Sequence, residues 1–309
     1  MLRGVFPVLS TPFFSDGRCD ARSLFRLVAQ VAKARAPGFV YPAIASEFAT
    51  LSVIERQEMV QTALAAAAEY GLQAIIGISS DSAQLSATLA QQALGGRAAG
   101  VMLMAPQETG ADPTKIVQFI NVATAGLNGC PVILQNASPP LGSSLPVTVV
   151  LEVLKAVPSI RYVKEENLPC GQRMTALLAG APASLLGVMG GAGGRFVVEE
   201  YLRGACGSMP SCELIEAHVA MWNLFQIGNV AGARAILSRL MPMLNLGSVF
   251  RQSSVKRVLA KRGLIESAYF RDNNPTLDPL DCSEIDAIMA DLGDLMKVFT
   301  DKAEEQDVI

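Results

Sequence analysis

The residues most able to do chemistry lie in one short stretch, from Ile160 to Asn167. It has the sequence Ile-Arg-Tyr-Val-Lys-Glu-Glu-Asn, an apolar run that ends in a lysine and two glutamates. Successive side chains of a strand point to opposite faces, so Lys164 and Glu166 should share one face and Glu165 the other. Burial disfavours the charged ammonium, and a neutral amine can attack a ketone. We interpret Lys164 as a nucleophile that forms a Schiff base with a 2-oxo acid; a solvated surface loop is the competing interpretation.

Short apolar runs recur along the chain, and most of them are followed by an amphipathic helical pattern. Runs that are continuously apolar are typical of parallel strands covered by helices. Eight strand–helix units predict an α/β fold, a (β/α)8 TIM barrel, with a doubly wound open sheet as the main alternative. The expected strands are Gly4–Phe13, Gly38–Ile44, Gln73–Ser79, Gly100–Ala105, Pro131–Ala137, Ile160–Glu166, Leu185–Gly191 and Cys206–Cys212.

Helical patterns fill the intervals between these strands and continue beyond the last of them. The helices expected within the barrel are Asp20–Arg35, Ser52–Tyr70, Asp81–Leu94, Asp112–Leu127, Pro146–Ala156, Gln172–Leu178, Phe196–Leu202 and Glu213–Ile227. Three further patterns, Val230–Leu244, Ser248–Arg262 and Cys282–Phe299, have no strand between them. We therefore expect a barrel over residues 1–227 and a C-terminal helical extension packed on it over residues 228–309.

Composition excludes several classes of function. The 309 residues are 50% hydrophobic, which is ample for a large core, and the formal net charge is -3. A weakly acidic chain offers no basic surface for nucleic acid or an anionic membrane. Its six cysteines are scattered without metal-binding spacing, so we expect reduced thiols, no metal site and a cytoplasmic protein.

Four stretches together resemble the dihydrodipicolinate synthase / N-acetylneuraminate lyase family of class I Schiff-base lyases. They are Gly4–Phe13, the segment from Ser46-Glu47 to Glu55-Arg56, Val163-Lys164-Glu165, and Gly204–Ser208. The resemblance implies that Lys164 is the Schiff-base lysine and that no cofactor is needed, since the lysine itself serves as the electron sink. It also implies a small 2-oxo acid as ligand and a homodimer or homotetramer.

The resemblance further implies a substrate site around the ends of the second, seventh and eighth strands. We expect Ser46 and the backbone near Ala45 to bind the substrate carboxylate. Gly190 should let the chain pass close to the substrate, and Ser208 should lie at the substrate site.

Several positions depart from the family pattern. Ile44-Ala45 replaces a hydroxyl pair, Gln107-Glu108 replaces an aromatic pair, and the segment after the fifth strand lacks the arginine that clamps a distal carboxylate. Gln135 stands where the family has a proton-shuttling tyrosine. Because an amide cannot exchange a proton at neutral pH, carbon–carbon cleavage is disfavoured and loss of water remains feasible.

One branch of the family, the L-2-keto-3-deoxyarabonate dehydratases, shares these departures. The matching features are Gln135, Glu166, Ser46-Glu47-Phe48-Ala49 and Arg251-Gln252-Ser253. The resemblance implies dehydration of a 2-keto-3-deoxy sugar acid to 2-oxoglutarate semialdehyde, with Lys164 as nucleophile, Glu166 as acid or base and Gln135 positioning substrate or water. Two alternatives stay open. One is an aldolase or a 4-hydroxy-tetrahydrodipicolinate synthase-type condensation, and the other is an inactive relative that binds a 2-oxo acid.

Overall fold

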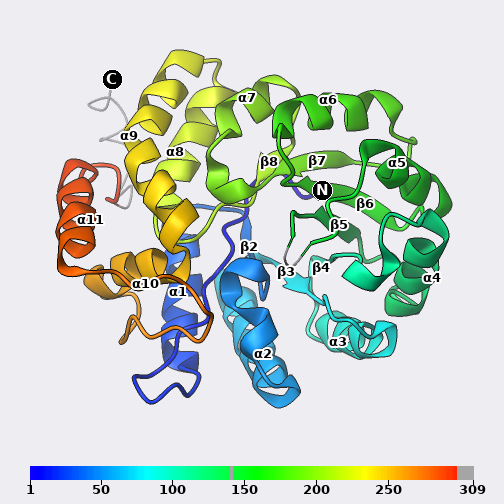
Figure 1. Cartoon of the computed structure of the whole chain (residues 1–309), viewed down its shortest axis with the longest axis horizontal. Coiled ribbons are helices and arrows are strands. Elements are labelled where there is room, and N and C mark those ends of the chain that lie inside the picture. Colours follow the sequence, from blue (N-terminus) through cyan, green and yellow to red (C-terminus); the bar gives the residue numbers. More distant parts are fainter. Residues whose placement is uncertain (140–141, 298–309) are drawn as a thin grey trace.

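Eight parallel strands form the centre of the molecule in the computed structural model, which describes residues 1–139 and 142–297 (Figure 1). They pair in the order β1-β8-β7-β6-β5-β4-β3-β2, and a parallel bridge between Val8 and Val40 joins the two ends. The predicted TIM barrel is confirmed. The strands are β1 (Gly4–Val5), β2 (Gly38–Tyr41), β3 (Gln73–Gly77), β4 (Gly100–Leu103), β5 (Val132–Asn136), β6 (Ile160–Glu165), β7 (Gly187–Gly190) and β8 (Gly207–Ser208).

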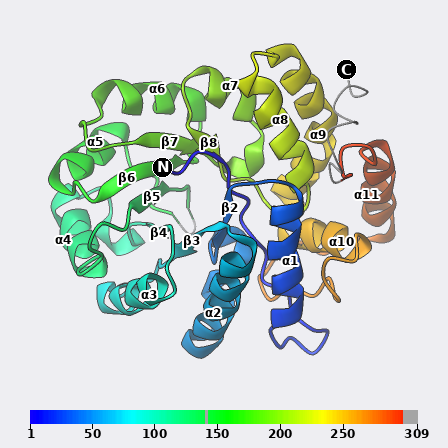
Figure 2. The ribbon, with the colours of Figure 1, turned by 180° about the vertical axis from the view of Figure 1, so that it is seen from behind.

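An outer ring of helices surrounds the strands and is seen from both ends in Figures 1 and 2. It contains α1 (Ala21–Lys33), α2 (Val53–Tyr70), α3 (Ala83–Gly95), α4 (Pro113–Ala123), α5 (Val147–Ala156), α6 (Cys170–Gly180), α7 (Val197–Leu202) and α8 (Ile215–Gln226). Short 3-10 turns η1 (Ile44–Ser46), η2 (Phe48–Thr50), η3 (Gln107–Thr109) and η4 (Ala192–Gly194) follow β2, β4 and β7. Ser52 and Glu55 form a capping box at the start of α2.

The first and last strands are much shorter than their apolar runs. Only Gly4–Val5 and Gly207–Ser208 are regular strands, although the chain continues in the same direction beyond both. Pro7 and Pro12 interrupt the first run and Pro210 the last, and proline has no N–H to donate to a ladder. The isolated bridges that Val8 makes with Val40 and Ser211 continue the barrel past these prolines.

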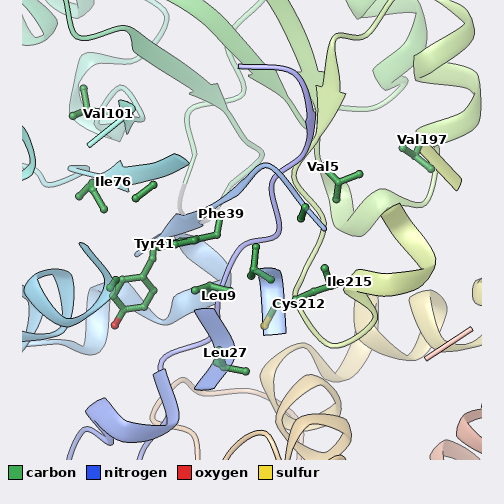
Figure 3. Close-up of a cluster of buried hydrophobic side chains, with 14 of the residues drawn as sticks. Val5, Leu9, Leu27, Phe39, Tyr41, Ile76, Val101, Val197, Cys212 and Ile215 are labelled. Atoms are coloured by element: carbon green, nitrogen blue, oxygen red, sulfur yellow. The ribbon is translucent and has the colours of Figure 1, made fainter. Parts of the chain in front are cut away.

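Two separate hydrophobic clusters occupy the inside and the outside of the barrel wall. Alternation along each strand sends one set of side chains inward and the other toward the helices. The helix-facing cluster includes Val5, Phe39 and Tyr41, with Leu27 of α1 and Ile215 of α8 packed against the wall (Figure 3). The interior cluster is formed by Leu2, Phe6, Val8, Val40, Ala43, Ile75, Met102, Ile133, Tyr162, Met189 and Met209.

Three helices follow the barrel: α9 (Val230–Phe250), α10 (Gln252–Lys261) and α11 (Pro279–Asp291). Figures 1 and 2 show α9 beside α8 and α11 at the edge of the molecule. The predicted break between Leu244 and Ser248 is wrong, because α9 runs on to Phe250 and ends at Arg251, which has φ 48°. Phe299, the predicted end of the last helix, lies outside the described residues. The division of the chain after residue 227 stays a prediction.

A buried ion pair attaches this extension to the barrel. Lys256 of α10 is fully buried, pairs with Glu47 and donates to the backbone oxygen of Tyr269 at 3.0 Å. The other oxygen of Glu47 accepts from the backbone N–H groups of Arg271 and Asp272 at 2.6 and 2.8 Å. Glu47 therefore joins the β2 loop to two separate segments of the extension.

Removing one partner of this pair should destabilise the protein strongly. Lys256→Ala leaves Glu47 as an uncompensated buried charge, so we expect the free energy of unfolding to fall by about 3–5 kcal/mol. Urea denaturation followed by circular dichroism measures the change. Arg239→Ala is the matched control, because its ion pair with Asp294 is solvent-exposed and should contribute less than about 1 kcal/mol. Equal losses in the two variants would contradict this account of the extension.

Candidate active site

A cavity of about 250 Å³ opens at the end of the barrel where the strands terminate. Its walls come from the β2, β7 and β8 loops, from the end of β6 and from the C-terminal extension. The lining residues are Val8, Ile44, Ala45, Lys164, Glu166, Ala192, Gly193, Arg195, Met209, Ser211, Glu213, Leu244, Gly247, Ser248, Arg251, Gln252, Val255 and Asp272. Catalytic groups of TIM barrels occupy this end of the strands.

Three of the predicted site residues form one connected chain of side chains. Lys164, only 3% exposed, lies in register with Gln135 of the neighbouring strand β5. The Lys164 Nζ is 3.0 Å from Glu166 Oε1, and Gln135 Nε2 donates to Glu166 Oε2 at 2.6 Å. The structure thus brings the proposed nucleophile, carboxylate and amide together.

Glu166 is held in its ionised form. Burial by itself raises the pKa of this carboxyl group, but the charge of Lys164 and the hydrogen bond from Gln135 hold the pKa below its ordinary value. The backbone N–H of Ala192 also donates to Oε1, at 3.2 Å. Gly191 makes this approach possible, because a Cβ there would lie 2.4 Å from the Glu166 side chain. Glu166 is therefore an acceptor of protons at neutral pH.

Glu165 has a different role from its neighbour. Its side chain is fully buried on the helix-facing side of β6, as the alternation predicts. It accepts hydrogen bonds from Asn136 at 3.0 Å and from the backbone of Asn167 at 2.9 Å, and it pairs with Arg173 at 3.2 Å. Glu165 fixes the loops after β5 and β6 and does not enter the cavity.

The prediction that Ser46 binds the substrate carboxylate needs correction. Its hydroxyl donates to the backbone oxygen of Leu9 at 2.5 Å and accepts from the N–H of Ala43 at 2.9 Å, and the residue is fully buried. These bonds close the η1 turn, so the hydroxyl faces the protein interior and does not line the cavity. Ala45, predicted beside it, does line the cavity together with Ile44.

Gly190 and Ser208 are also placed away from the cavity. A Cβ on Gly190 would lie 1.8 Å from the Glu200 carboxylate of α7, so this glycine accommodates a helix rather than a substrate. The Ser208 hydroxyl is 2.8 Å from the hydroxyl of Tyr201, also on α7. Both positions belong to the helix-facing side of the wall, and neither side chain reaches the cavity.

Other residues line the cavity without having been predicted as site residues. Arg195 follows the glycine-rich η4 turn. Arg251, whose φ is 48°, lies between α9 and α10. Ser211 and Glu213 follow β8. The alternation of the eighth apolar run could have indicated Ser211, whereas Glu213 lies in the turn beyond that run. The match of Arg251-Gln252-Ser253 to the dehydratase branch marked Arg251 without assigning it to the site, and nothing in the spacing of Arg195 distinguishes it from a surface arginine.

Within the described parts of the chain, no group of three or more His, Cys, Asp or Glu side chains is arranged to hold a metal ion. No helix there has both the length and the apolar character needed to cross a membrane.

Comparison with known proteins identifies the family. The profile of the Dihydrodipicolinate synthetase family matches residues 1–292. The chain belongs to this family. A crystal structure of dihydrodipicolinate synthase from Rhodopseudomonas palustris superposes with a TM-score of 0.86 at 26% identity, over 94% of this chain and 98% of that one.

Curated relatives are distant. The 4-hydroxy-tetrahydrodipicolinate synthase of Rhizobium meliloti is 26% identical over 95% of this chain and 99% of its own length. The synthase of Methanosarcina mazei is 28% identical, but the match spans only 56% of that protein and 54% of this chain. A prophage protein of E. coli K12, solved in complex with pyruvate, shares the fold at 18% identity, with a TM-score of 0.85 over 95% of this chain and 99% of that one.

The tyrosines of this family member all lie outside the cavity. The chain has five, and all five are in the described residues. Tyr41 and Tyr201 direct their hydroxyls to Thr11 and Ser208, and that of Tyr162 accepts from the backbone of Leu2. The remaining two, Tyr70 and Tyr269, are exposed. No phenol is therefore available to the lysine in this arrangement.

A second buried carboxyl group lies behind the β7 strand. Glu200 is fully buried, and neither of its carboxylate oxygens has a hydrogen-bond partner among the described residues. Burial, reinforced by the negative charges of Glu199, Glu166 and Glu165, raises the pKa of Glu200 to about 8. Glu200 is therefore mainly protonated at neutral pH.

Glu200 should make the stability of the protein depend on pH. The pKa of Glu200 is higher in the folded than in the unfolded chain. The free energy of unfolding should therefore fall as pH rises from about 4.5 to about 8, by roughly 4 kcal/mol in total. Glu200→Gln should abolish this loss, so the variant should gain stability relative to the parent at pH 8.5 but not at pH 4.5. Urea denaturation at the two pH values measures the free energy of unfolding of the variant and of the parent. If the difference between the two proteins does not change with pH, the raised pKa is not that of Glu200.

Proposed function

We propose that this protein is a Schiff-base lyase that removes water from a 2-keto-3-deoxy sugar acid. The leading substrate is L-2-keto-3-deoxyarabonate, which would give 2-oxoglutarate semialdehyde. One observation carries the proposal: Glu166 lines the cavity beside Lys164 and accepts a hydrogen bond from Gln135 outside the lining, and no tyrosine is among the described lining residues. This arrangement offers a base for a carbon-bound proton but no phenol to start carbon–carbon cleavage.

The first step joins Lys164 to the substrate. The amine attacks the C2 carbonyl, a proton passes from nitrogen to the developing hydroxyl group, and water leaves to give an iminium ion. Glu166, 3.0 Å from Nζ, can accept and return the protons that this step requires. The iminium then withdraws electrons from C3, which is why no separate cofactor enters the proposal.

The second step breaks the bond between C4 and its hydroxyl group. Glu166 takes a proton from C3, the C3–H electrons form the C3–C4 double bond, and the hydroxyl group departs with a proton as water. Loss of a C5 proton and reprotonation on carbon convert the remaining unsaturated alcohol to an aldehyde. Hydrolysis of the iminium releases product and restores Lys164. The balance is one substrate giving one semialdehyde and one water.

The size and shape of the cavity support a small substrate. Its volume of about 250 Å³ lies below the range of roughly 300–1,000 Å³ that is usual for drug-sized ligands. The backbone of Ile44 and Ala45 forms one wall and is the best-placed candidate to hold the C1 carboxylate. The guanidinium groups of Arg195 and Arg251 could bind hydroxyl groups at the far end of the substrate.

A second candidate function is condensation of pyruvate with aspartate semialdehyde. The names of the curated relatives favour it, since they are 4-hydroxy-tetrahydrodipicolinate synthases. The position of Gln135 argues against it, because an amide cannot relay the proton that this chemistry requires. An assay with pyruvate and aspartate semialdehyde together distinguishes the two candidate functions. Clear turnover of this pair would contradict the dehydratase proposal.

Lys164 should be the only site of covalent adduct formation. We expect sodium borohydride to trap L-2-keto-3-deoxyarabonate and pyruvate on the protein, with the mass increase located on the peptide that contains Lys164. Lys164→Ala should lose both the adduct and all turnover, because no other residue of the described cavity lining can form an imine. Absence of an adduct on the parent protein would reject an enzyme and favour a non-catalytic binding role.

Glu166 should be indispensable for removal of the carbon-bound proton, whereas adduct formation can also exchange its protons with solvent and should continue without it. In deuterium oxide, the enamine formed from pyruvate exchanges its methyl protons, which proton NMR follows. Glu166→Gln should slow this exchange by about 10²–10⁴-fold, the usual contribution of a positioned base, while borohydride trapping continues. Glu58→Gln, an exposed change on α2, is the control. Unchanged exchange in Glu166→Gln would assign the base to another residue.

A further inference from the structure

The segment that follows β8 lines the cavity with every second residue. Met209, Ser211 and Glu213 all face the cavity, whereas Ser208 and Cys212 belong to the helix-facing side of the wall. The bridge between Ser211 and Val8 keeps the segment extended along the barrel beyond the end of the regular strand. Ser211 is the last bridged residue, and Glu213 lines the cavity from the turn that leads into α8.

Glu213 is buried and incompletely bonded. It is 5% exposed, and its Oε1 accepts a hydrogen bond from the Ser211 hydroxyl at 3.1 Å. Its Oε2 has no hydrogen-bond partner among the described residues. Arg262 donates to the backbone oxygen of Glu213 and pairs with Glu216, so its guanidinium does not neutralise this carboxyl group directly. A buried polar atom left without a partner calls for an explanation.

The two cavity glutamates have opposite environments. Glu166 faces the Lys164 ammonium and two hydrogen-bond donors, which favour the carboxylate. Burial raises the pKa of Glu213, against weaker opposing contributions from local hydrogen bonds and from Arg262. When two carboxyl groups have such opposed environments, the one favoured as a carboxylate acts as the base and the one favoured in its neutral form acts as the acid. Asp272 also lines the cavity, and burial together with the charge of Glu47 raises its pKa as well, against Arg251 and Lys256, but Asp272 is more exposed than Glu213.

We propose that the Glu213 carboxyl group is the acid that protonates the departing C4 hydroxyl group. The proton of the Glu213 carboxyl group passes to the hydroxyl oxygen as the C4–O bond breaks and water leaves, and Glu213 regains a proton from solvent. Glu166 meanwhile takes the C3 proton and returns it to solvent, so the protons balance. This inference rests on the proposed dehydration.

The test separates the two glutamates by the intermediate that accumulates. Parent protein, Glu213→Gln and Glu213→Asp are mixed with L-2-keto-3-deoxyarabonate, quenched with borohydride and examined by mass spectrometry, and semialdehyde formation is measured in parallel. We expect Glu213→Gln to retain the adduct on Lys164 at the mass of the intact substrate, with product formation lowered by about 10²–10⁴-fold. The parent should carry the adduct that has lost water, and Glu213→Asp should recover part of the turnover.

Glu216→Gln is the matched control. It disturbs the same Arg262 and lies at the start of α8, three residues after Glu213, but Glu216 is not among the described lining residues of the cavity. It should lower thermal stability and leave turnover per trapped site unchanged. Turnover of Glu213→Gln within threefold of the parent, or loss of its adduct together with its thermal stability, would overturn the assignment. A parent protein that forms an adduct but never loses water would instead overturn the proposed function, and the acid role with it.

Discussion

The arrangement of this active site depends on one ion pair in a poorly solvated place, between Lys164 and Glu166. Each charge alone would be costly at the end of an apolar barrel, and each stabilises the other at 3.0 Å. The pair also explains its neighbours. Gln135 and the Ala192 N–H complete the hydrogen bonding of the carboxylate, and glycine at position 191 leaves room for it. When the Lys164 amine condenses with a substrate carbonyl, the resulting iminium carries a positive charge, so the Glu166 carboxylate still has a cationic partner.

The barrel was predictable from the sequence because its wall is covered on both sides. Continuous apolar runs and helical patterns alternate eight times, and no other signal was needed for the fold. Strand ends were less predictable, since prolines at positions 7, 12 and 210 truncate the ladders without changing the path of the chain. The end of α9 was missed for a different reason. Arg251 has a positive φ, and since it is neither glycine nor proline its residue type does not indicate that a helix ends there.

The position of the site residues was predictable mainly along the sixth strand. Period-two alternation put Lys164 and Glu166 on one face, the family resemblance singled out Gln135, and pairing of β5 with β6 brings Gln135 into register with Lys164. Ser46 and Ser208 show the limit of this reasoning. A hydroxyl near a strand end can face a substrate or a backbone carbonyl, and the choice depends on segments remote in sequence, such as Leu9 for Ser46 and Tyr201 for Ser208. Arg195 and Arg251 reach the cavity through loops whose paths no local pattern defines.

The lining of the cavity begins at Val8 and ends at Asp272. Val8 precedes the strand that carries Lys164, whereas Asp272 belongs to the segment that Glu47 attaches to the β2 loop. The compartment around the reactive lysine is therefore closed by the C-terminal extension as well as by the barrel, so the strands and their own loops supply only part of its wall.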